Sequence, residues 1–136
     1  WLGAVVCSIR LAEEITSLPG PYAAPAGALL LARGEQGRPV GTVGVRPHQA
    51  DACEIKRLYV RPDARGLGLG SLLAREALEA ARVRGYARAL LTSIPWTMDG
   101  AIEMYRRLGF EPTDPFFDHS HVAEDVEITF MGLDLR

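Results

Sequence analysis

A strand-like run is separated from a helical pattern by three glycines at alternate positions, Gly66, Gly68 and Gly70. The run at residues 54–60 is rich in aliphatic and aromatic residues, and it ends before Pro62, which has no N–H for a β-ladder. A glycine-rich turn that opens a helix leaves backbone N–H groups free, where the helix dipole adds positive potential. Arg65 adds a full positive charge. The segment is therefore predicted to bind an anion such as a phosphate.

Two common phosphate-binding patterns do not match this segment. The dinucleotide fingerprint needs Gly-x-Gly-x-x-Gly, whereas these glycines are spaced by two throughout. The nucleotide P-loop needs a lysine before its serine or threonine, but Ser71 directly follows Gly70. From the spacing alone, a flexible loop with helix-compatible glycines remains the alternative.

Length and composition fit one globular domain, residues 1–136. The 15 basic and 17 acidic residues nearly balance, so no strong field for nucleic acid or an anionic membrane is expected. Cys7 and Cys53 are too few for a disulfide framework, and the three histidines show no ligand spacing with them, so we expect no metal site and a reducing, cytoplasmic setting. The apolar residues 1–7 are not expected to form a signal peptide or spanning helix, because no positive region precedes them. The missing initial methionine suggests a trimmed chain.

The first half of the chain predicts one helix and then three strands. Apolar residues at near-helical spacing predict an amphipathic helix over residues 1–18, with a short strand inside Ala4–Ile9 as the alternative. A Pro/Gly-rich loop follows. The runs Ala28–Arg33, Val40–Arg46 and Cys53–Val60 predict antiparallel strands, because short turn-rich segments connect them.

The second half predicts two helices that alternate with strands. After Gly70 an apolar stripe indicates a helix that ends at Gly85; the stripe consists of Leu72, Leu73, Ala77, Leu78 and Ala81. Arg88–Ser93 is predicted as a buried strand parallel to the one before the helix.

A further helix is predicted from Thr97 or Met98 to Leu108, capped by Gly109, with Phe110 turned inward. Two final strands are predicted near Pro112–Phe117 and Val126–Leu135. Together these patterns predict an α/β fold with a mixed sheet.

Two motifs in this order resemble those of the GNAT superfamily, the Gcn5-related N-acetyltransferases. Arg65-x-x-Gly68-x-Gly70 follows a strand that ends Leu-Tyr-Val, and Ala101-x-x-x-Tyr105-x-x-x-Gly-Phe closes the second helix. The resemblance covers residues 28–135. It implies a central, mostly antiparallel sheet with a parallel strand–helix–strand unit, helices on both faces, and acetyl-CoA as cosubstrate. The chain departs from the family pattern in one respect, since no strand is evident before the first helix.

The resemblance also implies two catalytic residues. Glu54 matches the carboxylate that acts as general base, directly or through water, and Tyr105 matches the tyrosine that protonates the leaving CoA thiolate. Each has a structural alternative: Glu54 as a solvent-facing residue paired with Lys56 or Arg57, and Tyr105 as a core aromatic.

The expected cofactor site combines strand and loop backbone. The backbone of Leu58, Tyr59 and Val60 would pair with the pantetheine arm as an added strand does. The pyrophosphate would lie on the loop residues Arg65, Gly66, Leu67, Gly68, Leu69, Gly70 and Ser71. Arg61 either offsets its charge or is solvated.

The acceptor is less defined by the sequence. It is expected to be a primary amine of a small molecule or peptide, and the sequence does not name it. Tyr22 either touches it or packs as a surface aromatic. The alternative function is a non-catalytic acyl-CoA-binding sensor or partner-binding domain, and a homodimer is left open.

Overall fold

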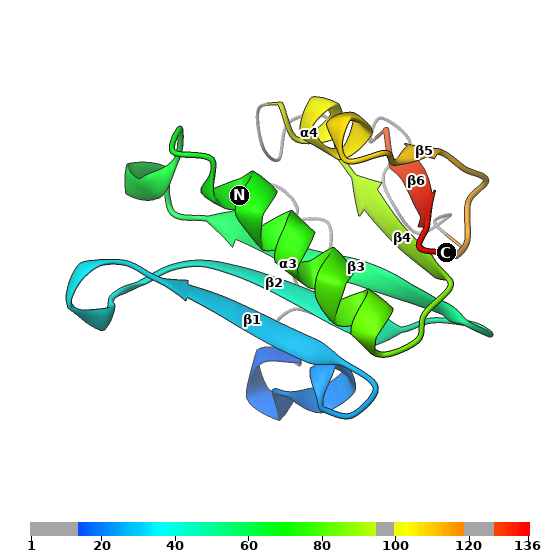
Figure 1. Ribbon diagram of the computed structural model, residues 1–136, viewed down its shortest axis with the longest axis horizontal. Helices are drawn as coiled ribbons and strands as arrows, with labels where there is room; N and C mark the ends of the chain where they lie inside the picture. Colours follow the sequence, from blue (N-terminus) through cyan, green and yellow to red (C-terminus); the bar gives the residue numbers. More distant parts are fainter. Residues whose placement is uncertain (1–13, 95–99, 119–126) are drawn as a thin grey trace.

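The computed structural model describes residues 14–94, 100–118 and 127–136. Within these residues a six-stranded sheet has the order β1-β2-β3-β4-β6-β5 (Figure 1). The strands are β1 (Ala28–Arg33), β2 (Pro39–Pro47), β3 (Ala52–Val60), β4 (Arg88–Ser93), β5 (Glu111–Pro112) and β6 (Thr129–Asp134). The helices are α3 (Leu69–Val83) and α4 (Ala101–Arg107), and the short 3-10 turns are η1 (Gly20–Tyr22), η2 (Glu35–Gly37) and η3 (Pro62–Ala64). The predicted α/β class is confirmed.

Strands β1, β2 and β3 form the predicted antiparallel meander. Alternate side chains of a strand point to opposite faces, and Val43 and Val45 of β2 belong with Ile55 of β3 to the core cluster beneath α3. The residues between them therefore face the other side of the sheet. At Arg57 the register shifts and the backbone φ is 60°, which makes a β-bulge in β3.

Strands β3 and β4 are parallel, as predicted, but they pair over three residues only. The pairs run from Ala52↔Arg88 to Glu54↔Leu90, and beyond them the two strands diverge (Figure 1). The second half of β3 is therefore bonded to β2 on one edge and leaves its other edge without a strand partner among the described residues.

Helix α3 differs from its prediction at the start. It begins at Leu69, with Gly68 in a left-handed conformation at the N-cap, so Gly70 lies inside the first turn. Its buried stripe is Leu73, Ala74, Ala77, Leu78 and Ala81, whereas Leu72 is half exposed. Ala74, and not Leu72, is the buried neighbour of Leu73 in this stripe. Gly85, at φ 86°, follows the helix end as expected.

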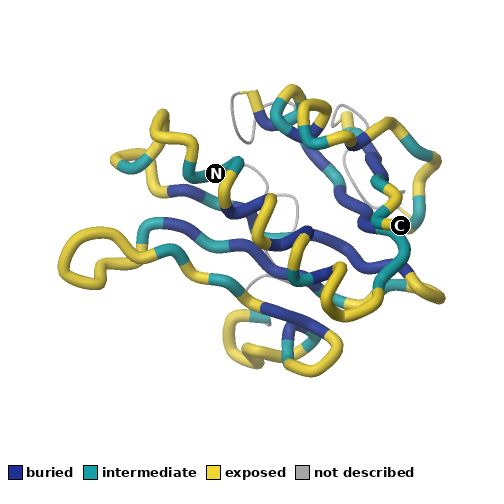
Figure 2. The backbone as a smooth tube through the Cα atoms, viewed as in Figure 1, coloured by how far each residue is buried: buried dark blue, intermediate teal, exposed yellow. Residues whose placement is uncertain are grey.

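Helix α4 is shorter than predicted. Gly100 precedes it at φ 75°, a left-handed conformation that interrupts a helix, and residues 97–99 lie outside the described chain. The end of the helix is confirmed, since Gly109 has φ 103° and Phe110 is buried. One hydrophobic cluster joins Ala101 and Tyr105 of α4 to the inner face of α3 (Figure 2 shows the burial).

The predicted strand over Pro112–Phe117 is wrong for most of its length. Only Glu111 and Pro112 pair with β6, which begins at Thr129. Phe116 and Phe117 instead pack with each other and with Phe130 in edge-on or tilted contacts. Packing of these aromatic rings replaces a β-ladder here.

The N-terminal expectations are only partly addressed. Residues 14–17 are helical, in agreement with the end of the predicted helix. The alternative strand within residues 4–9, and the question of a first strand, lie outside the described residues. Across the described ranges, no helix is long and apolar enough to span a membrane. No group of potential metal ligands gathers there either.

Candidate active site

The loop before α3 presents a row of free backbone N–H groups. The first hydrogen bond of the helix runs from the Leu72 N–H to the Gly68 carbonyl, at 3.1 Å. In the described part of the chain, no hydrogen bond is donated by the N–H groups of residues 66–71. No side chain caps the helix, and Gly68 adopts φ 80°, which favours glycine. This arrangement suits an anion at the helix N-terminus.

A cleft of about 580 Å³ lies between the start of α3 and the start of α4. Its α4 side is made by Gly100, Ala101, Met104 and Arg107. The predicted cofactor residues that line it are Val60, Arg65, Gly66, Gly68, Leu69, Gly70 and Ser71. The tertiary structure therefore brings the predicted phosphate-binding loop and the second motif to one cleft.

Three predicted cofactor residues do not line this cleft. The Leu58 side chain is buried in the core, and Leu67 is 83% exposed. The ring of Tyr59 lies beneath the Arg65 guanidinium, with 5.5 Å from the guanidinium carbon to the ring centre. The roles predicted for these three residues use their backbone groups, so the direction of their side chains does not test those roles.

Arg65 is held at the mouth of the cleft by β3 itself. Its Nε donates to the Val60 carbonyl at 2.9 Å, so this carbonyl is already bonded within the protein. Arg61 lies 3.6 Å from Asp63 with about half of its side chain exposed. Arg61 therefore fits a solvated surface side chain better than a residue that offsets the pyrophosphate charge. Arg65 is positioned to contact an anionic ligand.

Arg107 is a cleft residue that sequence reasoning missed. It brings a second guanidinium to the cleft from α4, on the side across from Arg65. Its side chain is 77% exposed and shares an i,i+4 contact of 3.8 Å with Glu103. The motif contains two adjacent arginines, and only the helix phase and the position of α4 decide that Arg107, and not Arg106, lines the cleft. Two guanidinium groups and a row of free N–H groups fit a pyrophosphate.

Glu54 lies where β3 and β4 begin to part. It belongs to the last pair of the two strands, with Leu90, and only 8% of the residue is exposed. Among the described residues it forms no ion pair, so the predicted alternative of a pair with Lys56 or Arg57 is not observed. A largely buried carboxylate without a charged partner is available to accept a proton.

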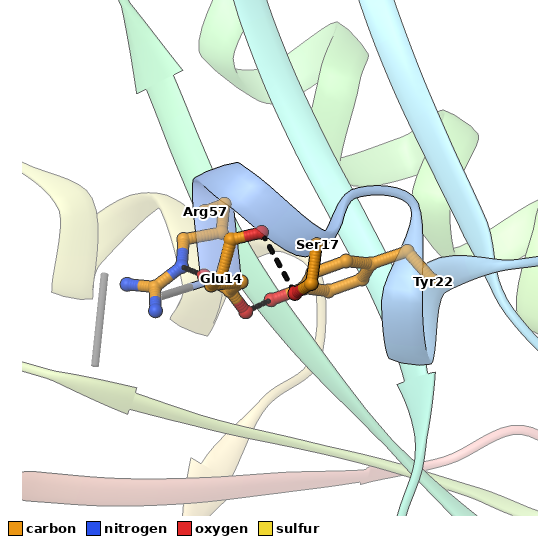
Figure 3. A network of polar contacts seen from close by, with 4 residues as sticks. All are labelled: Glu14, Ser17, Tyr22 and Arg57. Carbon is orange, nitrogen blue, oxygen red and sulfur yellow. Dashed lines mark hydrogen bonds and ion pairs between the residues drawn. The ribbon is translucent and has the colours of Figure 1, made fainter. Parts of the chain in front are cut away.

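Arg57 is instead bound by Glu14, which also binds Tyr22 (Figure 3). The Arg57 Nε donates to one carboxylate oxygen at 2.6 Å, and the Tyr22 hydroxyl donates to the other at 2.5 Å. Burial by itself would raise the pKa of Glu14, but the two hydrogen bonds and the Arg57 charge hold it below its ordinary value. Burial and the bond to Glu14 raise the pKa of Tyr22.

Tyr22 is a core residue in the described structure. It is 2% exposed, and its ring occupies the space that a Cβ at Gly44 would need, with atoms 2.6 Å away. A side chain so enclosed does not form part of an open acceptor wall. The same contact places η1 on the sheet face opposite α3.

Tyr105 lies behind the α4 wall of the cleft. It is 8% exposed, and its ring packs edge-on against Phe110 at 5.8 Å between centres. Burial raises its pKa to about 12, so the phenol keeps its proton at neutral pH. The neighbouring Ala101 and Met104 line the cleft, whereas Tyr105 itself does not.

Cys53 is buried and has a free thiol, and burial raises its pKa to about 12. A protonated, fully enclosed thiol is a poor nucleophile, so Cys53 is a core residue and not a catalytic candidate.

Comparison with known proteins identifies the family. The sequence profile of the Acetyltransferase (GNAT) family matches residues 9–110, which include the predicted phosphate-binding loop and the second motif. The chain belongs to the GNAT acetyltransferase family. Members use acetyl-CoA as cosubstrate, and this GNAT chain is an acetyl-CoA-dependent acyltransferase.

Relatives of this GNAT domain include proteins from distant organisms. An uncharacterized N-acetyltransferase of Schizosaccharomyces pombe is 38% identical over 124 residues, which span 90% of this chain and 73% of that protein. The structure of an acyl-CoA N-acyltransferase from Klebsiella pneumoniae has a TM-score of 0.74 and 25% identity, over 98% of this chain and 86% of that one. An acetyltransferase from Salmonella typhimurium, solved with its cofactor acetyl-CoA, has a TM-score of 0.63 and 23% identity. The match covers 79% of this chain and 64% of that one.

Proposed function

We propose that this GNAT domain moves an acetyl group from acetyl-CoA to a primary amine of a small molecule or peptide. Glu54 acts as the general base and Tyr105 as the general acid. The observation that carries the proposal is the position of Glu54 at the last β3–β4 pair, largely buried and without an ionic partner among the described residues. The carboxylate thus lies at the point where the strands open.

The opened strand edge and the loop support a defined place for acetyl-CoA. The free N–H groups of residues 66–71 and the guanidinium groups of Arg65 and Arg107 would hold the pyrophosphate. The edge of β3 that has no strand partner would run beside the pantetheine arm, and this directs the thioester toward Glu54.

The reaction then needs two proton transfers. The neutral amine nitrogen attacks the thioester carbonyl carbon, and the new C–N bond forms before the C–S bond breaks. Glu54 takes the amine proton, directly or through water, and Tyr105 gives its proton to the departing thiolate. Burial raises the pKa of Tyr105 to about 12, so the phenol carries a proton at neutral pH. A cytoplasmic setting is part of this proposal.

The test is acetyl-CoA turnover against a panel of amines, with the variant Glu54→Gln. We expect kcat to fall about a hundredfold or more while the Kd of CoA stays the same, because glutamine cannot accept a proton. The acidic limb of the pH–rate profile should also disappear. Glu76→Gln on the exposed face of α3 is the matched control. Retention of both the rate and the limb in Glu54→Gln would assign the base role to another group.

A further inference from the structure

The sheet face that carries Glu54 also carries a group of cations. Arg46 of β2 lies directly opposite Glu54 in the antiparallel register, so the two side chains share one face. Lys56 is two positions after Glu54 and faces the same way, opposite Gly44. This face is the one covered by Tyr22, away from α3.

Within the described part of the chain, one of the three cations Arg46, Lys56 and Arg57 has an ion pair. Arg57 is paired with Glu14 at 2.6 Å. Arg46 and Lys56 are both half-buried and have no salt bridge within the described ranges. The charge of Lys56 does contribute to the lowered pKa of Glu14. Partly buried cations without counterions beside a reaction centre create a local positive potential.

We propose that Arg46 and Lys56 bind a carboxylate of the acceptor whose amine is acetylated beside Glu54. This inference rests on the proposed function and names its substrate class: an amine that carries a carboxylate nearby, as an amino acid does. Among the described residues, the three cations Arg46, Lys56 and Arg57 face two carboxylates, those of Glu14 and Glu54, and an acceptor carboxylate would supply a third negative charge.

The spacing of the strand residues suits such a molecule. Residues directly opposite on antiparallel strands have Cβ atoms about 5 Å apart. The amine of an amino acid can therefore approach Glu54 while its carboxylate meets the long side chain of Arg46, which offers two parallel N–H donors. The same positive potential disfavours a charged ammonium and so favours the neutral, nucleophilic amine. It also disfavours polycationic acceptors such as polyamines.

The experiment compares an amino acid with its carboxamide, for example phenylalanine and phenylalaninamide, as acetyl acceptors. The ratio of their kcat/KM values is measured in the wild type, Arg46→Gln and Lys56→Gln. The different basicity of the two amines cancels when ratios are compared between enzymes. We expect the carboxylate-to-amide ratio to fall about tenfold or more in Arg46→Gln, which corresponds to about 1.4 kcal/mol, and to fall in Lys56→Gln as well.

Two controls separate charge from structure. Arg46→Lys keeps the charge and should restore part of the ratio, whereas Arg75→Gln on the exposed face of α3 should leave it unchanged. An unchanged CoA affinity shows that each variant is folded. Equal ratios in the wild type and both glutamine variants would overturn the inference, and so would acetylation of polyamines in preference to carboxylate-bearing amines. Absence of turnover with every acceptor would instead overturn the proposed function.

Discussion

Glu14 and Arg57 form a largely buried ion pair of 2.6 Å between positions 43 residues apart. Arg57 is the bulged residue of β3, and its φ of 60° is unfavourable for an arginine. The ion pair connects Glu14, in the segment before the sheet, to this bulge (Figure 3). The bulge lies three residues after Glu54. It therefore connects the chain ahead of the sheet to the strand on which the proposed chemistry takes place.

We expect Glu14→Gln to lower the free energy of unfolding by about 1.5–3 kcal/mol, because a charged hydrogen bond is lost and Arg57 stays largely buried without its counterion. The pKa of Glu14 is depressed in the folded protein, so its contribution is complete above the unfolded value of about 4.3 and is lost as the pH falls through the folded pKa. Denaturant titrations from pH 7 to pH 3 measure both effects.

The variants Tyr22→Phe and Arg57→Gly refine this prediction. Tyr22→Phe removes one hydrogen bond to the charged Glu14 carboxylate and should cost about 1.5–3 kcal/mol. Arg57→Gly loses the ion pair but relieves the positive φ, so its net loss should be smaller than that of Arg57→Gln. A Glu14→Gln protein with wild-type stability and the same acid dependence would show that the pair contributes nothing.

Arg107 allows a matched test of the cleft, because Arg106 beside it does not line the cleft. Each arginine forms an exposed ion pair with Glu103, so substitution of either one removes one exposed ion pair. Arg107→Gln should weaken CoA binding about three- to tenfold, because one cation facing the pyrophosphate is lost. Arg106→Gln should have no effect. Calorimetric titration with CoA at two salt concentrations measures the affinity of each variant. Equal CoA affinities for the two variants would exclude a phosphate contact by Arg107.

Tyr105→Phe separates chemistry from packing. Phenylalanine keeps the ring and its contact with Phe110, and among the described residues no hydrogen bond of the Tyr105 hydroxyl is observed, so stability should change by no more than about 1 kcal/mol. If the phenol is the acid, acetyl transfer should slow by about ten- to a thousandfold. Single-turnover kinetics and a thermal melt on the same variant measure the two quantities.

The alkaline side of the rate profile gives a second check on Tyr105. Burial raises its pKa to about 12, so the phenol should remain protonated, and the acid available, up to that pH. A loss of rate between pH 8 and 10 would then belong to another group. Near-normal transfer in Tyr105→Phe would leave this residue a core aromatic and favour a water molecule as the proton donor.

Local chemistry made much of this protein predictable from its sequence. Short apolar runs bounded by polar, Gly or Pro residues predicted the strands Ala28–Arg33 and Arg88–Ser93 at their observed bounds, because such runs favour short strands with one or both faces buried. Glycines that take positive φ marked the helix ends at Gly85 and Gly109. The open start of α3 was equally readable, since free amides at a helix start need only a local pattern of small residues; phosphate binding there stays a prediction.

Features that depend on distant segments were decided by the tertiary structure. The sequence contained Arg107 but did not distinguish it from Arg106, because only the approach of α4 to α3 determines which one lines the cleft. Likewise Arg57, one of the two partners predicted for Glu54, is bound by Glu14 from far along the chain. The sequence by itself therefore determined most of the elements and the open helix start at residues 66–71. The parting of β3 and β4, and with it the environment of Glu54, follows from how the twisted sheet packs, which no local pattern records.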